Sequence, residues 1–114
     1  MSFDDDDEAA LGALDALVPE AGARYVLERV ADRGDHAQYK AAIVSADARW
    51  DYDAILRDDG RVELTAITAA PEAQAAMLAM IAKLVARATP NRKADGLAAW
   101  PPRIQRWRGP GRGA

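Results

Sequence analysis

Residues 71–88, PEAQAAMLAMIAKLVARA, carry the longest run of helical periodicity in the chain. Pro71 suits the first position of a helix, and Thr89-Pro90 predicts its end, because a residue that precedes proline is disfavoured in the α conformation. The large apolar residues recur at the i, i+3, i+4, i+7 and i+8 positions of one helix face. They are Met77, Met80, Ile81, Leu84 and Val85, extended by Ala73 and Ala88. We expect this face to pack on a sheet.

Two strands joined by a tight turn are predicted just before this helix, over residues 49–57 and 61–68. Residues 58–60, DDG, fit a type I turn with the glycine in the left-handed conformation. If Leu56 opposes Val62, the apolar residues of both strands share one face, and a slip of one residue would invert this arrangement. The further pairs are Ala54 with Leu64, Tyr52 with Ala66, and Trp50 with Thr68. The apolar face is expected to receive the helix.

Residues 38–46 contain residues that favour a strand beside alanines that favour a helix, so the pattern is compatible with either. We predict a strand there, because an isolated two-stranded hairpin is marginally stable. Residues 9–17 and 19–33 are predicted as helices, or as one kinked helix, and Gly34 fits a left-handed C-terminal cap. The apolar stripes behind these two predictions are Leu11, Leu14 and Leu17, and Val26, Leu27, Val30 and Ala31.

The expected fold class is therefore α+β. It comprises two N-terminal helices, a three-stranded antiparallel meander, one long helix packed on the sheet, and an extended C-terminal tail. A chain of 114 residues is expected to form one domain. We assign residues 1–8 to an acidic, partly disordered N-terminus, residues 9–90 to the domain, and residues 91–114 to a basic tail rich in Trp, Pro, Arg and Gly.

Composition excludes several kinds of chemistry. The chain has no cysteine, so disulfides, zinc–thiolate sites and thiol nucleophiles are excluded. The first residues are acidic, unlike a secretory signal, and no apolar run is long enough to span a membrane. We expect a cytoplasmic protein that makes no membrane contact. The alanine and arginine usage is typical of a GC-rich bacterial genome.

The sequence contains few residues that could form a catalytic site. A serine triad would have to join Ser45 to His36, the only histidine, and no nucleophile motif surrounds Ser45. Asp51, Asp53 and Glu63 share a predicted strand face, so a metal-dependent enzyme is one alternative, although a solvated face with cross-strand charge pairs explains them more simply. No glycine-rich loop precedes a helix. We therefore expect a non-enzymatic protein without cofactor or metal.

The tail offers a candidate binding site. Residues 90–114 carry six basic residues and one acidic residue, whereas the rest of the chain is acidic. Tryptophan and arginine are enriched at protein interface hot spots, and they also stack on bases and contact phosphates. The alternatives are folding of the tail onto the body, a protein partner, and a nucleic acid. The candidate residues are Trp100, Arg103, Arg106, Trp107 and Arg108.

The central helix has a second face made largely of alanine. Alanines allow another helix to approach closely, either the N-terminal helices of the same chain or the same face of a second copy, which would make a homodimer. The residues are Ala75, Ala79, Ala82 and Ala86. The leading hypothesis is a small bacterial interaction or regulatory module that binds a protein partner. The first alternative is nucleic-acid binding through the tail.

Overall fold

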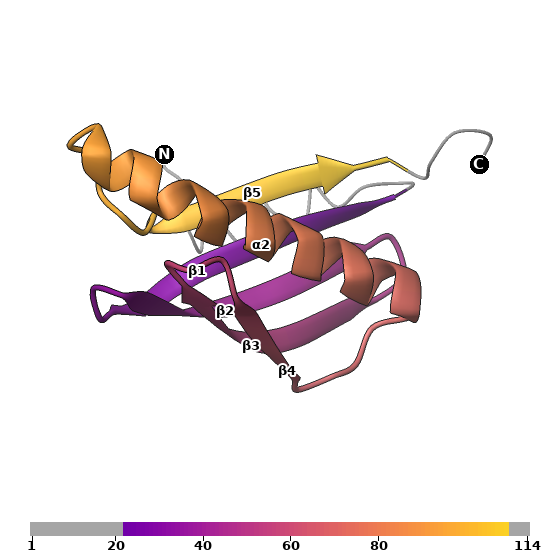
Figure 1. Cartoon of the computed structure of the whole chain (residues 1–114). Helices are drawn as coiled ribbons and strands as arrows, with labels where there is room; N and C mark the ends of the chain where they lie inside the picture. The colour runs from indigo at the N-terminus through magenta and orange to yellow at the C-terminus, as the bar shows by residue number, and fades with distance from the viewer. Residues whose placement is uncertain (1–21, 110–114) are drawn as a thin grey trace, which may run out of the picture.

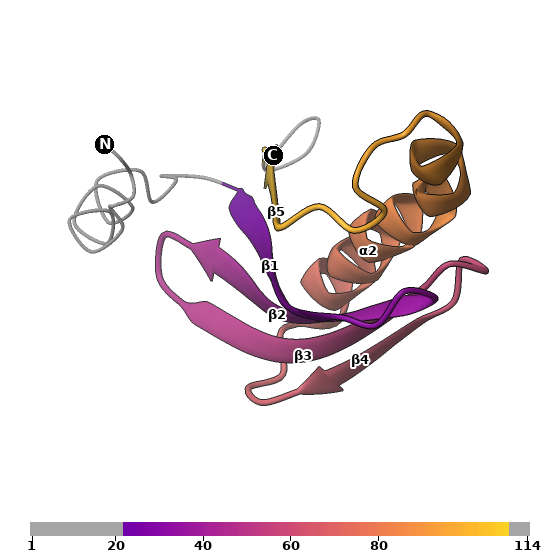
Figure 2. The same cartoon turned by 90° about the vertical axis from the view of Figure 1, so that its left-hand side faces the viewer.

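The computed structural model describes residues 22–109, which form a five-stranded antiparallel sheet with one helix against one face (Figure 1). The elements are β1 (Ala23–Asp32), β2 (His36–Ser45), β3 (Arg49–Arg57), β4 (Val62–Ala66), α2 (Glu72–Ala94) and β5 (Arg103–Arg108). Across the sheet the order is β4-β3-β2-β1-β5, so the last strand pairs with the first. Figure 2 shows α2 over one face of this curved sheet.

The prediction of a helix over residues 19–33 was wrong, because most of this segment forms β1. A two-residue alternation places Ala23, Tyr25 and Leu27 in the core, each at most 4% exposed. The helical stripe would have buried Val30, which lies at a register irregularity and is 58% exposed. Gly34 is left-handed, as a C-terminal cap would be, but it lies in the turn between two strands.

The expected three-stranded meander is therefore incomplete, although its strands are present. Residues 38–46 lie mostly in β2, and β3 has the bounds predicted. The register confirms that the apolar residues of the two hairpin strands share one face, because Leu56 opposes Val62 and Tyr52 opposes Ala66. Gly60 has a φ of 92°, which confirms the left-handed turn glycine. The pairing of Trp50 with Thr68 does not form, because β4 ends at Ala66.

Helix α2 extends beyond its predicted end. It continues through Pro90 to Ala94, and Pro90 is exposed. The helix stops at Gly96, whose φ is 76°. There the amide of Gly96 donates to the Lys93 carbonyl, and the amide of Leu97 donates to the Arg92 carbonyl (3.0 and 2.9 Å). This is the Schellman arrangement, in which a left-handed glycine satisfies the last carbonyls. The stop signal was therefore the glycine rather than the proline.

Helix α2 is also rotated relative to the predicted face. Met80 and Leu84, which were expected in the core, are 45% and 54% exposed. Ala82 and Ala86, which were expected on the outer face, are buried against the sheet. The residues of α2 that face the sheet are Leu78, Ile81, Ala82, Val85, Ala86 and Thr89. Small side chains let the helix approach the bulky sheet residues closely. Half of the predicted alanine face, Ala82 and Ala86, therefore packs on the sheet, whereas Ala75 and Ala79 are partly exposed.

Residues expected in an extended C-terminal tail complete the sheet. β5 pairs with β1, and its Ile104 lies opposite Leu27 in the core. Trp100 is buried, and its indole Nε1 donates to the Gly34 carbonyl (2.9 Å).

The prediction of a helix over residues 9–17 falls outside the described residues. The structure therefore corrects the fold class to one helix on a five-stranded antiparallel sheet for the part of the chain that it describes. In residues 22–109, no helix combines the length and apolarity that a membrane span requires.

Candidate functional site: a groove between the helix and the edge strand

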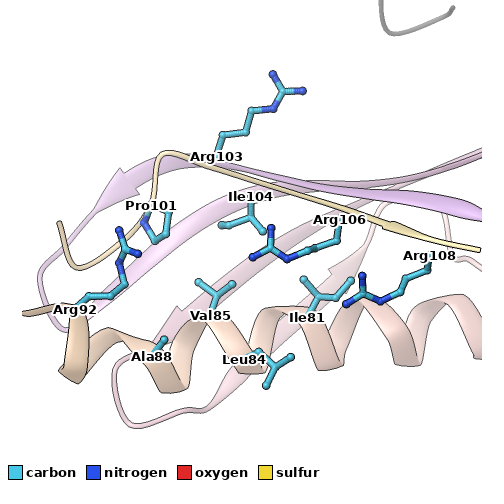
Figure 3. A pocket seen from close by; sticks show the side chains of 10 residues that line it. All are labelled: Ile81, Leu84, Val85, Ala88, Arg92, Pro101, Arg103, Ile104, Arg106 and Arg108. Atoms are coloured by element: carbon cyan, nitrogen blue, oxygen red, sulfur yellow. The ribbon is translucent and has the colours of Figure 1, made fainter. Parts of the chain in front are cut away.

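A groove of about 310 Å³ runs between α2 and β5 (Figure 3). Its apolar wall comes from the side of α2 that faces away from β3 and β4, together with the inward side of β5. The apolar lining residues are Ile81, Leu84, Val85, Ala88, Pro101 and Ile104. Because Leu84 is more than half exposed and Ala88 is also exposed, this wall meets solvent. An apolar cleft beside charged groups is a common form of binding site.

Arg106 and Arg108 lie over this apolar wall. They alternate with Trp107 along β5, so both project from the strand toward α2, as Ile104 does (Figure 3). Among the described residues, their guanidinium groups donate to neighbouring backbone carbonyls, those of Gln105 and Trp107 (2.9 and 3.0 Å). Within residues 22–109 no carboxylate forms an ion pair with either arginine. The groove is therefore cationic as well as apolar, and it suits an amphipathic anion.

The other arginines of the groove already have partners within the chain. Arg92 donates from Nε to the Ala98 carbonyl (2.8 Å), which holds the loop after α2 in place. Arg103 points away from α2 in Figure 3 and pairs with Glu28 of β1 (3.5 Å). Arg106 and Arg108 differ from both, because within residues 22–109 they pair with no carboxylate and hold no loop in place.

The five residues of the predicted tail site do not lie together in the structure. Trp100 is a core residue, so its ring is not available to stack on a ligand. Trp107 is 52% exposed but lies on the opposite face of the sheet from the groove. Arg103 lies at the rim of the groove, and its side chain points away from α2 (Figure 3). Only Arg106 and Arg108 of the five residues lie together on one surface with an apolar wall.

The candidate catalytic residues are not brought together. His36 and Ser45 stand at opposite ends of β2, nine residues apart, which corresponds to about 30 Å along a strand. His36 Nδ1 lies 2.6 Å from Asp35 Oδ1, and this hydrogen bond lowers the pKa of the Asp35 carboxyl. The Ser45 hydroxyl donates to the Ala48 carbonyl (3.3 Å).

The three strand carboxylates face cations instead of one another. Asp51 pairs with Arg49 (3.1 Å), Asp53 with Lys40 (3.4 Å) and Glu63 with Arg57 (3.1 Å). No cluster of three or more His, Cys, Asp or Glu suited to a metal ion occurs in the part of the chain that the structure describes. The arrangement is that of a solvated sheet face with charge pairs.

Sequence reasoning named both groove arginines but missed the helix wall beside them. Leu84 and Ala88 were interpreted as core residues but are exposed, because the helix is apolar on more than one side; Val85 is a core residue, as predicted, and also lines the groove. The alternation of Ile104, Arg106 and Arg108 was the available signal, since a two-residue period places all three on one face of a strand. The chain was also compared with models of protein families, with curated proteins and with solved structures, and none of them matched.

Proposed function

We propose that this protein is a non-catalytic interaction module that binds an extended segment of a partner protein along β5. The observation that carries the proposal is the pair Arg106 and Arg108, which have no carboxylate partner among residues 22–109 and lie over an apolar wall whose outer part, Leu84 and Ala88, is exposed. The segment it fits carries both acidic and apolar side chains on one strand face, at every second residue.

Strand addition explains how such a segment would bind. β5 is an edge of the sheet, and an edge strand offers unpaired backbone N–H and C=O groups to another chain. A strand added there would direct every second side chain to the side on which Ile104 lies. Its apolar side chains would cover Leu84 and Ala88, and its carboxylates would reach Arg106 and Arg108. Backbone hydrogen bonds would supply affinity, and the groove would select the side chains.

The test uses a fluorescein-labelled peptide of two Leu-Ser-Glu-Ser repeats, in which leucine and glutamate share one strand face, with anisotropy measured on the full chain. We expect the double variant Arg106→Ala/Arg108→Ala to bind the peptide about tenfold more weakly, because each lost charge pair at a partly solvated site is worth up to about 1 kcal/mol. Arg49→Ala/Arg61→Ala is the matched control, since it also removes two arginines, both exposed, and neither of them lines the groove. It should change binding less than twofold.

Two results would contradict this proposal. Equal weakening by Arg49→Ala/Arg61→Ala and the groove variant would indicate general attraction between charges instead of a site. Tighter binding of an oligothymidylate of equal charge, lost equally in both variants, would favour the nucleic-acid alternative. Strand addition has a separate readout, because it should slow amide hydrogen exchange in residues 103–108 but not in β4 at the other edge of the sheet.

A further inference from the structure

The face of the sheet opposite α2 is partly buried, although no element within residues 22–109 covers it (Figure 2). Arg24 of β1 is only 6% exposed, and Ala42 of β2 is 8% exposed. Both side chains point to this open face, because they alternate with Tyr25 and Ala41 of the core. Two side chains on a face that no described element covers stay this far from solvent only under a further layer, so their burial indicates one.

The buried residues belong to a continuous apolar patch. Strand register places Arg24 between Val44 of β2 and Trp107 of β5. In the same register Val26 lies beside Ala42. We call this surface the β1–β2 patch, and it consists of Arg24, Val26, Ala42, Val44 and Trp107. The remainder of the open face is different, because it carries charged residues in ion pairs such as Glu28 with Arg103 and Lys40 with Asp53.

One segment of the chain has the composition and the position to cover this patch. Residues 1–21 contain seven acidic residues and no basic residue, which complements the cationic Arg24. Leu11, Leu14 and Leu17 recur every three residues, a spacing that predicts one apolar helix face. The segment joins β1 at Gly22, two residues before Arg24. Such a short tether gives a high effective concentration at the patch.

We propose that residues 9–17 bind the β1–β2 patch through their leucines. The segment then completes a three-layer arrangement in which α2 covers one face of the sheet and the N-terminal segment covers the other. Its carboxylates lie near Arg24 and away from Arg106 and Arg108, so the groove stays open to a partner. The proposal concerns the opposite face from the groove, and it stands or falls independently of the proposed function.

A single spin label on the full chain tests this placement. The protein has no cysteine, so Ala13→Cys gives one labelling position beside Leu14. We expect the label to broaden the NMR signals of the Val26 and Val44 methyl groups and the Trp107 indole by at least severalfold. The Leu84 methyl groups, in the groove on the other face, should keep their intensity. Adding Leu14→Asp to the labelled chain should restore the patch signals, while unchanged sheet resonances show that the protein is still folded.

Three outcomes would overturn the proposal. Broadening at Leu84 instead of Val26 would place the segment in the groove. Broadening of the patch only in mixtures of spin-labelled and isotope-labelled molecules would show that a second copy covers the patch. No broadening on either face would show that residues 9–17 bind neither surface.

Discussion

Tyr39 is a buried tyrosine whose ionisation should make the fold sensitive to alkali. It is 1% exposed, and its hydroxyl donates to the Pro101 carbonyl (2.7 Å), which ties β2 to the segment before β5. Burial is the main cause that raises its pKa from 10.0 to about 12. A pKa raised in the folded state means that the folded protein holds the proton more tightly than the unfolded chain does. This contribution is therefore complete below pH 10 and is lost as the pH rises to 12.

We expect the free energy of unfolding to fall by up to about 3 kcal/mol between pH 10 and pH 12 because of this one group. Urea denaturation at a series of pH values measures the fall. In Tyr39→Phe the group cannot ionise, so the decline across this interval should be shallower, although the variant starts less stable because the Pro101 carbonyl loses its donor. A decline as steep as in the unchanged protein would show that Tyr39 is not responsible.

Two glycines with positive φ should differ in their tolerance of a side chain. At Gly22 a Cβ atom would collide with the Arg108 carbonyl oxygen, whereas at Gly34 nothing lies within 4 Å of one. Gly34→Ala therefore adds only the cost of a left-handed alanine, about 1 kcal/mol. Gly22→Ala adds a backbone clash where β1 meets β5, and we expect it to cost at least twice as much in urea denaturation. Equal costs would mean that β5 shifts freely to make room.

At the scale of the element, the alanine side of α2 that is buried on the sheet should tolerate substitution poorly, and its exposed side should tolerate it well. Ala86 is fully buried on the sheet, so Ala86→Leu would force three extra carbons between helix and strands and cost about 1–3 kcal/mol. Leu84 is 54% exposed, so Leu84→Ala should cost less than about 1 kcal/mol. Thermal unfolding of the two variants measures both effects. The sequence-based orientation of the helix predicts the reverse order.

At this scale, an element could be predicted when its apolar residues fitted only the helix period or only the strand period. It could not be predicted when they fitted both. In β3, Trp50, Tyr52, Ala54 and Leu56 alternate strictly, so strand, bounds and facing were all predicted. In β1, Val26 and Leu27 fit a helical stripe as well as an alternation, and a single sequence does not show which tertiary partner is present. β1 became a strand because pairing with β2 and β5 buries Tyr25 and Leu27 together, and such long-range pairing leaves no local signal.

The candidate site could be predicted only in part for the same reason. Arg106 and Arg108 were singled out by charge, but their common face became definite only when β5 paired with β1. The apolar wall required the rotation of α2, which the sequence does not determine because Met80 and Leu84 are as apolar as the residues that face the sheet. Tryptophan content was a poor guide, since Trp100 fills the core and Trp107 lies on the other face.

At the scale of the whole molecule, the C-terminal strand should be necessary for the fold. A chain that ends at residue 102 loses β5, which exposes Leu27 and Tyr25 of β1 and removes Ile104 from the core. We expect this truncation to lower the free energy of unfolding by at least about 3 kcal/mol, measured in urea. A chain that ends at residue 109 keeps every described strand and should unfold near the urea concentration of the full chain. Similar stability of the two chains would contradict a structural role for β5.

The pairing of β1 with β5 also has a consequence for protein synthesis. The ribosome makes β1 first and β5 after all the other elements, so the nascent chain carries an unpaired β1 edge until residues 103–108 emerge. During that interval α2 has only part of its apolar surface covered. Folding can begin in the β2–β3–β4 meander, whose contacts are local, but closure of the sheet must wait for the C-terminal residues. Premature termination just before β5 would therefore release a chain with an exposed edge, which is prone to aggregate.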